Sequence, residues 1–159
     1  MGSVKTLGWL SVTLVGLFTP AFAVTDADRI AVYKEFRTQF DAKQYAAAQP
    51  LAERLVKLTE EQFGPDELQL TNPLTNLATI HYKLGNYAES VRFLERAVEL
   101  KPQDPVLNDH LGDALWRVGR EREAKFQWDQ SLTLDPEPEE MEKIKKKLAE
   151  GMPPAAEAR

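Results

Sequence analysis

The sequence predicts an all-α protein made of stacked helical hairpins, and three observations support this prediction. First, one pattern is written twice, 34 positions apart. Its first copy contains Leu77-Ala78, Gly85 and Leu94, and its second contains Leu111-Gly112, Gly119 and Trp128. Second, apolar residues recur at spacings of three and four, as in helices with one buried face. Third, glycines and cap-plus-proline pairs separate these segments. A fixed period of this length indicates helix pairs packed in a row.

The first 23 residues have the layout of a secretory signal peptide. Lys5 precedes an apolar run over residues 7–18, and the small-x-small site at 21–23 follows Pro20. We therefore predict cleavage after Ala23. The apolar run has 12 residues, whereas a membrane-spanning helix needs about 20. No stable membrane anchor is expected after cleavage.

Length and charge restrict the class of protein further. The chain has 159 residues, enough for one domain, which we place at 24–150. Loss of Lys5 leaves 19 basic against 25 acidic residues, a net charge of −6. This balance argues against nucleic acid as a partner, because phosphate binding needs a basic surface. The chain has no cysteine, so its core must hold the fold without disulfides.

Start and stop signals place the expected helices. Thr25 or Asp26 can cap the first helix, and Asn72-Pro73 and Asp104-Pro105 are cap-plus-proline starts for two later ones. Residues 66–71 are left open as a separate turn or as part of the helix at Pro73. The expected helices span about 27–41, 44–63, 73–84, 87–100 and 139–150, with one between Pro105 and the turn at Gly119 and one from that turn to Pro136.

The last expected helix, 139–150, is predicted to cap the stack. Met141, Ile144 and Leu148 give it one narrow apolar stripe on an otherwise charged helix. A row of hairpins leaves its final apolar face open, and a polar-backed helix is the usual cover. Residues 151–159, rich in proline and alanine, are predicted to be a flexible tail.

The repeated residues resemble the tetratricopeptide repeat. The two matching copies contain Leu77-Ala78, Gly85, Tyr87, Leu94, Ala97 and Pro102, and then Leu111-Gly112, Gly119, Ala124, Trp128 and Pro136. Three repeats result, at about 27–66, 71–104 and 105–138. The first resembles the longer, 42-residue repeats of kinesin light chains, with Lys43 where glycine is usual. The last resembles small exported repeat proteins of Gram-negative bacteria.

This resemblance implies a right-handed superhelix whose concave groove is lined by the first helix of each pair. Such proteins bind peptides or protein segments and catalyse nothing. By the period, the groove stripe consists of Tyr33, Arg37, Phe40, Thr75, Thr79, Tyr82, Lys83, Asp109, Asp113, Trp116 and Arg117. Rigid aromatic rings beside charges suit peptide recognition. Two alternatives stay open: Tyr82 and Trp116 can pack between repeats, and Asp109 and Asp113 can form a solvated acidic face partly paired with Arg117.

The predicted function is a protein-interaction adaptor or scaffold of the bacterial envelope, periplasmic, with full secretion as an alternative. Recognition of a C-terminal carboxylate is disfavoured because Asp109 and His110 stand where basic residues would be needed. No cofactor, metal or catalysis is expected. Asp109, His110 and Asp113 do not all face one site on a helix, and no reactive constellation is found. The main alternative is a homo-oligomeric structural protein; small-molecule binding or enzymatic activity is the third.

Overall fold

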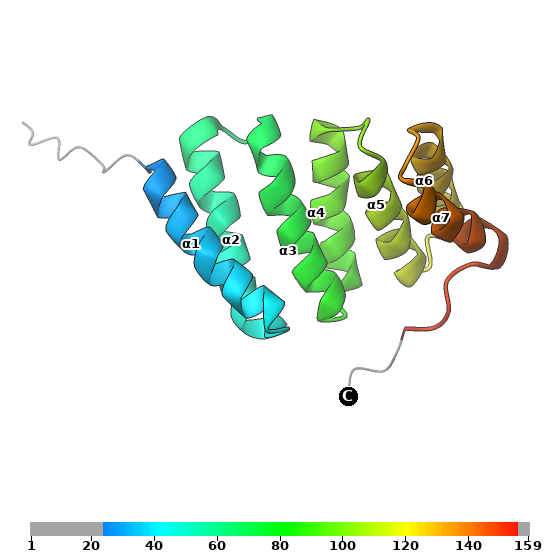
Figure 1. Ribbon diagram of the computed structural model, residues 1–159, viewed down its shortest axis with the longest axis horizontal. Coiled ribbons are helices and arrows are strands. Elements are labelled where there is room, and N and C mark those ends of the chain that lie inside the picture. The colour runs from blue at the N-terminus through cyan, green and yellow to red at the C-terminus, as the bar shows by residue number, and fades with distance from the viewer. Residues whose placement is uncertain (1–23, 156–159) are drawn as a thin grey trace, which may run out of the picture.

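The computed structural model describes residues 24–155, and all regular structure among them is helical (Figure 1). The predicted signal peptide and residues 156–159 of the predicted tail lie outside the described residues. The elements are α1 (Asp26–Asp41), α2 (Tyr45–Phe63), the short 3-10 helix η1 (Leu68–Leu70), α3 (Thr71–Lys83), α4 (Tyr87–Leu100), α5 (Pro105–Arg117), α6 (Glu121–Thr133) and α7 (Pro138–Glu150).

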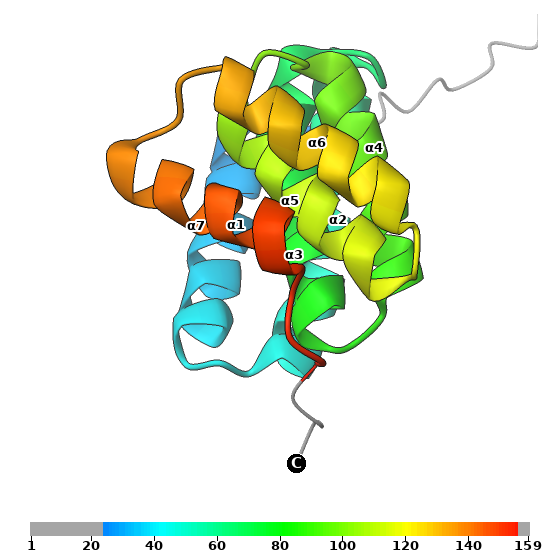
Figure 2. The ribbon, with the colours of Figure 1, turned by 90° about the vertical axis from the view of Figure 1, so that its right-hand side faces the viewer.

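Three antiparallel hairpins, α1–α2, α3–α4 and α5–α6, stand side by side in chain order, and α7 follows the last one (Figure 1). Seen along the row, α1 and α7 lie on one side and α4 and α6 on the other (Figure 2). Each helix packs on the one before it and the one after it. The predicted all-α superhelix of helical hairpins is therefore confirmed.

The same backbone turn closes all three hairpins. The first helix of each pair ends with a left-handed residue, Lys43 at φ 58°, Gly85 at 79° and Gly119 at 80°. The amide after this residue donates to the carbonyl five positions back in every case, as Asn86 does to His81. The amide of the left-handed residue itself donates to the carbonyl three positions back, as Gly85 does to Tyr82. These two hydrogen bonds satisfy carbonyls that the helix end would leave free. The repeat is thus present in the backbone even where Lys43 breaks it in the sequence.

Helix starts follow the sequence signals with one exception. Thr25 and Asp28 form a reciprocal capping box on α1, and Asp104 accepts from the amides of the first turn of α5. The predicted start at Asn72-Pro73 is wrong, because α3 already begins at Thr71 and no side chain caps it. The 3-10 turn before α3 brings Leu70 into the core and winds directly into the helix. Pro73 is tolerated because the first turn has no intrahelical acceptors for its amides.

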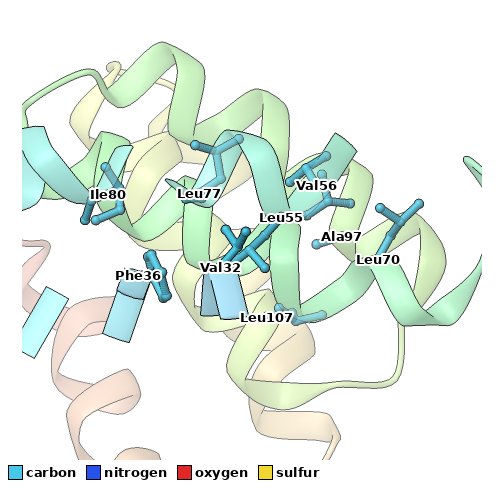
Figure 3. Packing of buried hydrophobic residues seen from close by; sticks show 12 residues of the cluster. Val32, Phe36, Leu55, Val56, Leu70, Leu77, Ile80, Ala97 and Leu107 are labelled. Atoms are coloured by element: carbon cyan, nitrogen blue, oxygen red, sulfur yellow. The ribbon is translucent and has the colours of Figure 1, made fainter. Parts of the chain in front are cut away.

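The buried apolar residues form two clusters that follow each other along the row. The first joins all elements from α1 to α5 around Phe36, Leu77 and Ile80 (Figure 3). The second joins α3 to α7 around Trp128 and Leu115. Both clusters cross from one hairpin to the next, so each hairpin buries apolar residues against its neighbours as well as between its own two helices.

The third hairpin contains the largest buried side chain, Trp128, and a glycine makes room for it. Trp128 is fully buried, and a methyl group on Gly112 would overlap its indole ring. At the equivalent positions of the second hairpin, 34 residues earlier, Ala78 faces the smaller Leu94. A smaller residue on the first helix thus accompanies a larger residue on the second helix, and the combined volume of each pair can fit a closely packed interior.

We predict that Lys43→Gly stabilises the protein. A lysine in the left-handed region is strained, and its side chain is exposed, so only the backbone term changes. Relief of that strain, less the extra entropy of glycine in the unfolded chain, should raise the free energy of unfolding by about 0.5–1 kcal/mol. Urea denaturation measures the change, and Gly85→Ala, which introduces the same strain, should lower stability. A less stable Lys43→Gly protein would show that the side chain makes a contact of its own.

We also predict strong coupling between Gly112 and Trp128. Gly112→Ala should destabilise by about 1–3 kcal/mol through overpacking, and Trp128→Leu by a similar or larger amount through the cavity it leaves. The double variant reproduces the pairing of Ala78 with Leu94, so it should lose clearly less than the sum of the single losses. Additive losses in a thermal or urea double-mutant cycle would contradict this packing.

Candidate functional site

Three pockets lie in a line between consecutive first helices of the hairpins. The N-terminal pocket, about 370 Å³, opens between α1 and α3; the middle pocket, about 160 Å³, between α3 and α5; and the C-terminal pocket, about 460 Å³, between α5 and α7. The second helices supply their floors, for example through Leu55 and Leu94. We call this line of pockets the groove.

The N-terminal pocket has two exposed apolar side chains on its α1 wall. Tyr33 is 46% exposed and Ile30 53%. Asn72, Thr75 and Asn76 of α3 face them across the pocket. An extended chain lying here would meet one apolar wall and one wall of amides and hydroxyls.

The middle pocket is smaller, and its accessible surface is mainly apolar with polar groups on its walls. Tyr82 stands on its wall with the hydroxyl accepting a hydrogen bond from Arg117 Nε at 3.0 Å, and its ring meets Tyr87 edge-on at 5.1 Å. Burial raises the pKa of Tyr82, so the phenol stays protonated and can donate as well as accept. Thr79, Lys83, His110 and Asp113 complete the walls over a floor of Ser90 and Leu94.

At the C-terminal end of the groove, the chain itself pairs the carboxylates of α5. Lys147 of α7 contacts both Asp109 and Asp113, the latter at 2.6 Å, and Trp128 Nε1 also donates to Asp113 at 2.9 Å. The pairing of Asp113 with Arg117 considered from the sequence is not formed. Arg117 instead donates to Tyr82 and to the carbonyl of Pro153.

The last described residues cover part of the predicted groove stripe. The ring of Trp116 packs on Trp128, with centroids 5.4 Å apart, and Gly151 sits so close that a side chain there would overlap the indole. Met152 packs against the same cluster. Trp116 therefore lies between its own hairpin and the start of the predicted tail, and a role for it in partner binding stays a prediction.

The eleven predicted groove residues thus divide into two groups. Seven of them line the three pockets: Tyr33, Thr75, Thr79, Tyr82, Lys83, Asp109 and Asp113. The other four do not. Phe40 packs on Phe36 and Tyr45, Arg37 pairs with Asp41 at 3.0 Å, and Trp116 and Arg117 lie under the C-terminal segment.

Sequence reasoning missed several lining residues that the period itself contains. Asn76, His110 and Ile144 are spaced by 34 residues and all line pockets. Thr79, Asp113 and Lys147 have the same spacing and lie at equivalent positions of α3, α5 and α7. Lys147 donates a hydrogen bond to Asp113. Continuing the period into α7 would have placed Lys147 beside Asp113.

Comparisons with known proteins agree with this architecture. A family model of the tetratricopeptide repeat matches residues 37–103. The type III secretion translocator chaperone SycD of Yersinia enterocolitica is 16% identical, with a TM-score of 0.66 over 79% of this chain and 92% of that one. SycD in complex with a peptide of the translocator YopD is 14% identical, with a TM-score of 0.64 over 79% of this chain and 90% of that one.

Another similar structure is the first repeat domain of Spaghetti (RPAP3) bound to the HSP90 peptide SRMEEVD, at 19% identity. Its TM-score is 0.62 over 80% of this chain and 98% of that one. No curated protein sequence matches significantly. The family model covers residues 37–103, and the three repeated hairpins have the architecture of a small tetratricopeptide repeat protein.

Neither a cluster of metal ligands nor a membrane-spanning helix is found among the described residues. Among residues 24–155, no group of three histidine, cysteine, aspartate or glutamate side chains is placed to hold a metal ion. No helix in this part of the chain is long and apolar enough to cross a membrane.

We predict that Asp109 makes stability fall as the pH rises. Burial, together with the nearby charge of Asp113, raises the pKa of Asp109 above its ordinary value of 3.8 despite the Lys147 contact. The folded state then binds this proton more tightly than the unfolded state, so stability is lost as the pH rises from about 3.8 through the folded pKa. Asp109→Asn, which keeps an acceptor for Lys147, should lack this loss.

The measurement is urea unfolding of both proteins across this pH range. The stability advantage of Asp109→Asn should grow with pH and then level off. Asp129→Asn, at an exposed position on α6, is the matched control and should show no such growth. An advantage that shrinks with pH would mean that the Lys147 ion pair outweighs burial.

Proposed function

We propose that this protein is a non-catalytic interaction adaptor of the bacterial cell envelope that holds an extended peptide or a helix of a partner protein in its groove. The observation on which this rests is the presence of a pocket between each two consecutive first helices, α1 and α3, α3 and α5, and α5 and α7. Each pocket combines apolar and hydrogen-bonding groups, as the side chains of a bound segment would require.

Peptide complexes of similar folds support the proposal. SycD and the Spaghetti repeat domain are described as bound to a YopD peptide and an HSP90 peptide, and both cover most of this chain. The exposed Tyr33 and Ile30 add an apolar contact that a partner would bury. Aromatic residues of this kind supply large contact area at low entropic cost.

The envelope location rests on the sequence alone. Residues 1–23 have the charge, apolar run and small-residue site of a signal peptide. The chain has no cysteine, so in an oxidising compartment its core alone would hold the fold. Release from the cell is the alternative location.

Self-association is the alternative function. It would require an apolar surface on the terminal helix, whose stripe of Met141, Ile144 and Leu148 is narrow. Ile144 is fully buried inside the molecule, and the exposed positions next to it are Lys145 and Lys146. Both lysines pair with glutamates of the same helix, so this face is charged and not apolar, and α7 gives the alternative little support.

We predict that a photo-crosslinker at Tyr33 captures a foreign protein in the native host. Benzoylphenylalanine replaces one exposed aromatic residue by another, so the fold should be unaffected. Phe126 on α6, which is 60% exposed and lies outside the groove, is the matched control position. The Tyr33 probe should give a distinct heteromeric band, and the Phe126 probe should not; mass spectrometry identifies the partner.

Three other outcomes would change the conclusion. Crosslinks only between copies of this chain would favour self-association. The same bands from both positions would show that the partner does not bind specifically in the groove. The intact mass of the recovered protein tests export, because the proposal requires a chain that starts at Val24.

A further inference from the structure

The last described residues, 151–155, lie against α5, and we call them the C-terminal segment. They follow α7 without regular structure (Figure 2). Gly151, at φ 74°, turns the chain out of the helix, and its backbone lies against the indole ring of Trp116. Met152 is half-buried and packs against the second core cluster, which Trp116 also contacts. The first two residues of the segment thus make its apolar contacts.

A hydrogen bond holds the next residue of the segment. Arg117 donates through Nη1 to the carbonyl of Pro153 and through Nε to the hydroxyl of Tyr82, on the wall of the middle pocket. Pro153 and Pro154 have no amide hydrogen, so the segment presents acceptors and no donor at this point. Arg117 supplies the matching donor and joins the segment to the groove.

These contacts are those of a bound extended peptide. The segment contains an apolar side chain that is half-buried, followed by two prolines that favour an extended backbone. Extended proline-containing segments dock on aromatic side chains, and here the aromatic ring is that of Trp116. Trp116 and Arg117 are also two of the residues that the repeat period assigned to partner binding. The end of the chain therefore covers a surface expected to serve a partner.

The C-terminal segment is held less firmly than the helix before it. Residues 153–155 are exposed, and within the described part of the chain the bond from Arg117 is the one hydrogen bond that residues 152–155 form. By contrast, α7 is fixed by the fully buried Ile144 and by the ion pairs of Lys147. The segment can therefore leave its place while α7 stays packed on the last hairpin.

We propose that the surface formed by Trp116 and Arg117 is a binding site for an extended partner segment in which an apolar residue is followed by proline. The C-terminal segment occupies this site until the partner displaces it. The apolar side chain of the partner then takes the place of Met152, and the next carbonyl accepts from Arg117. This inference rests on the proposed function and names the sequence chemistry that the α5 part of the groove selects.

The direct test is a titration with a peptide copy of the segment, acetyl-Gly-Met-Pro-Pro-Ala-amide, followed by the indole N–H signal of Trp116 in NMR. The protein carries Met152→Ser, which weakens the intramolecular contact. The peptide should shift the Trp116 signal in a saturable manner. It should bind the unmodified protein at least about tenfold more weakly, because the attached segment competes at high effective concentration. Acetyl-Gly-Ser-Pro-Pro-Ala-amide, which lacks the apolar side chain, should bind neither protein.

Further variants separate recognition from folding. Added to Met152→Ser, Arg117→Gln should weaken peptide binding by about tenfold, as loss of a charged hydrogen-bond donor does. Arg122→Gln, at an exposed position on α6, is its control for net charge and should bind normally. Ala155→Gly, at the exposed end of the segment, is the control for Met152→Ser and should bind the peptide as weakly as the unmodified protein does. Circular dichroism should show the same helical content for all of them.

Capture in the native host connects the site to the partner. The Tyr33 probe should capture more of the partner in the Met152→Ser protein than in the Ala155→Gly protein, since release of the segment opens the α5 part of the groove. Equal capture by these two proteins would limit the site to the chain's own end and overturn the proposal. So would equal binding of the two peptides, or binding that Arg117→Gln leaves undiminished.

Failure of the proposed function has a different signature. A Tyr33 probe that captures no foreign protein in any variant would remove the groove function and the partner's part of this inference with it. Saturable binding of the methionine peptide would in that case still establish that Trp116 and Arg117 recognise the C-terminal segment. Dimers that appear only in the unmodified protein at high concentration would show that the segment exchanges between two copies, and would overturn its role as a competitor within one chain.

Discussion

The packing of Trp128 connects the last three helices, and the end of the groove depends on it. Its ring fills the space left by Gly112 of α5, and its indole N–H donates to Asp113. Lys147 of α7 lies over the same ring at 5.4 Å while pairing with the two carboxylates of α5. One side chain thus fixes the distance between α5 and α6, the direction of Asp113 and the place where α7 rests.

The cap follows from the same repeat rule as the hairpins. Counting on by 34 residues, α7 occupies the place of the first helix of a further repeat. Positions that face the partner helix in α5, Leu111 and Gly112, become Lys145 and Lys146 in α7 and face solvent. The positions of α7 that pack on the preceding hairpin are apolar, as Ile144 and Leu148 show. In α7 the face that would meet a partner helix has thus changed from apolar to charged, as in a capping helix.

The sequence was sufficient for the hairpins because their signals are local. Helical spacing, Gly85, Gly119 and the Asp104 cap act within a few residues of where they stand, so their outcome does not depend on distant partners. The end of the groove was less predictable. Whether Trp116 faces a ligand or the chain depends on how residues 151–153 return across α5, and no local pattern encodes such a return.

The two ends of the groove therefore differ in what they offer a partner. At the C-terminal end, the chain already supplies Lys147 for the carboxylates and a carbonyl for Arg117, so a ligand would have to displace satisfied contacts there. At the N-terminal end, the apolar side chains of Ile30 and Tyr33 are exposed. Binding free energy comes from groups whose interactions improve in the complex, and satisfied groups gain little. Affinity for a partner should accordingly be concentrated between α1 and α3, and the ion-paired carboxylates of α5 should contribute less.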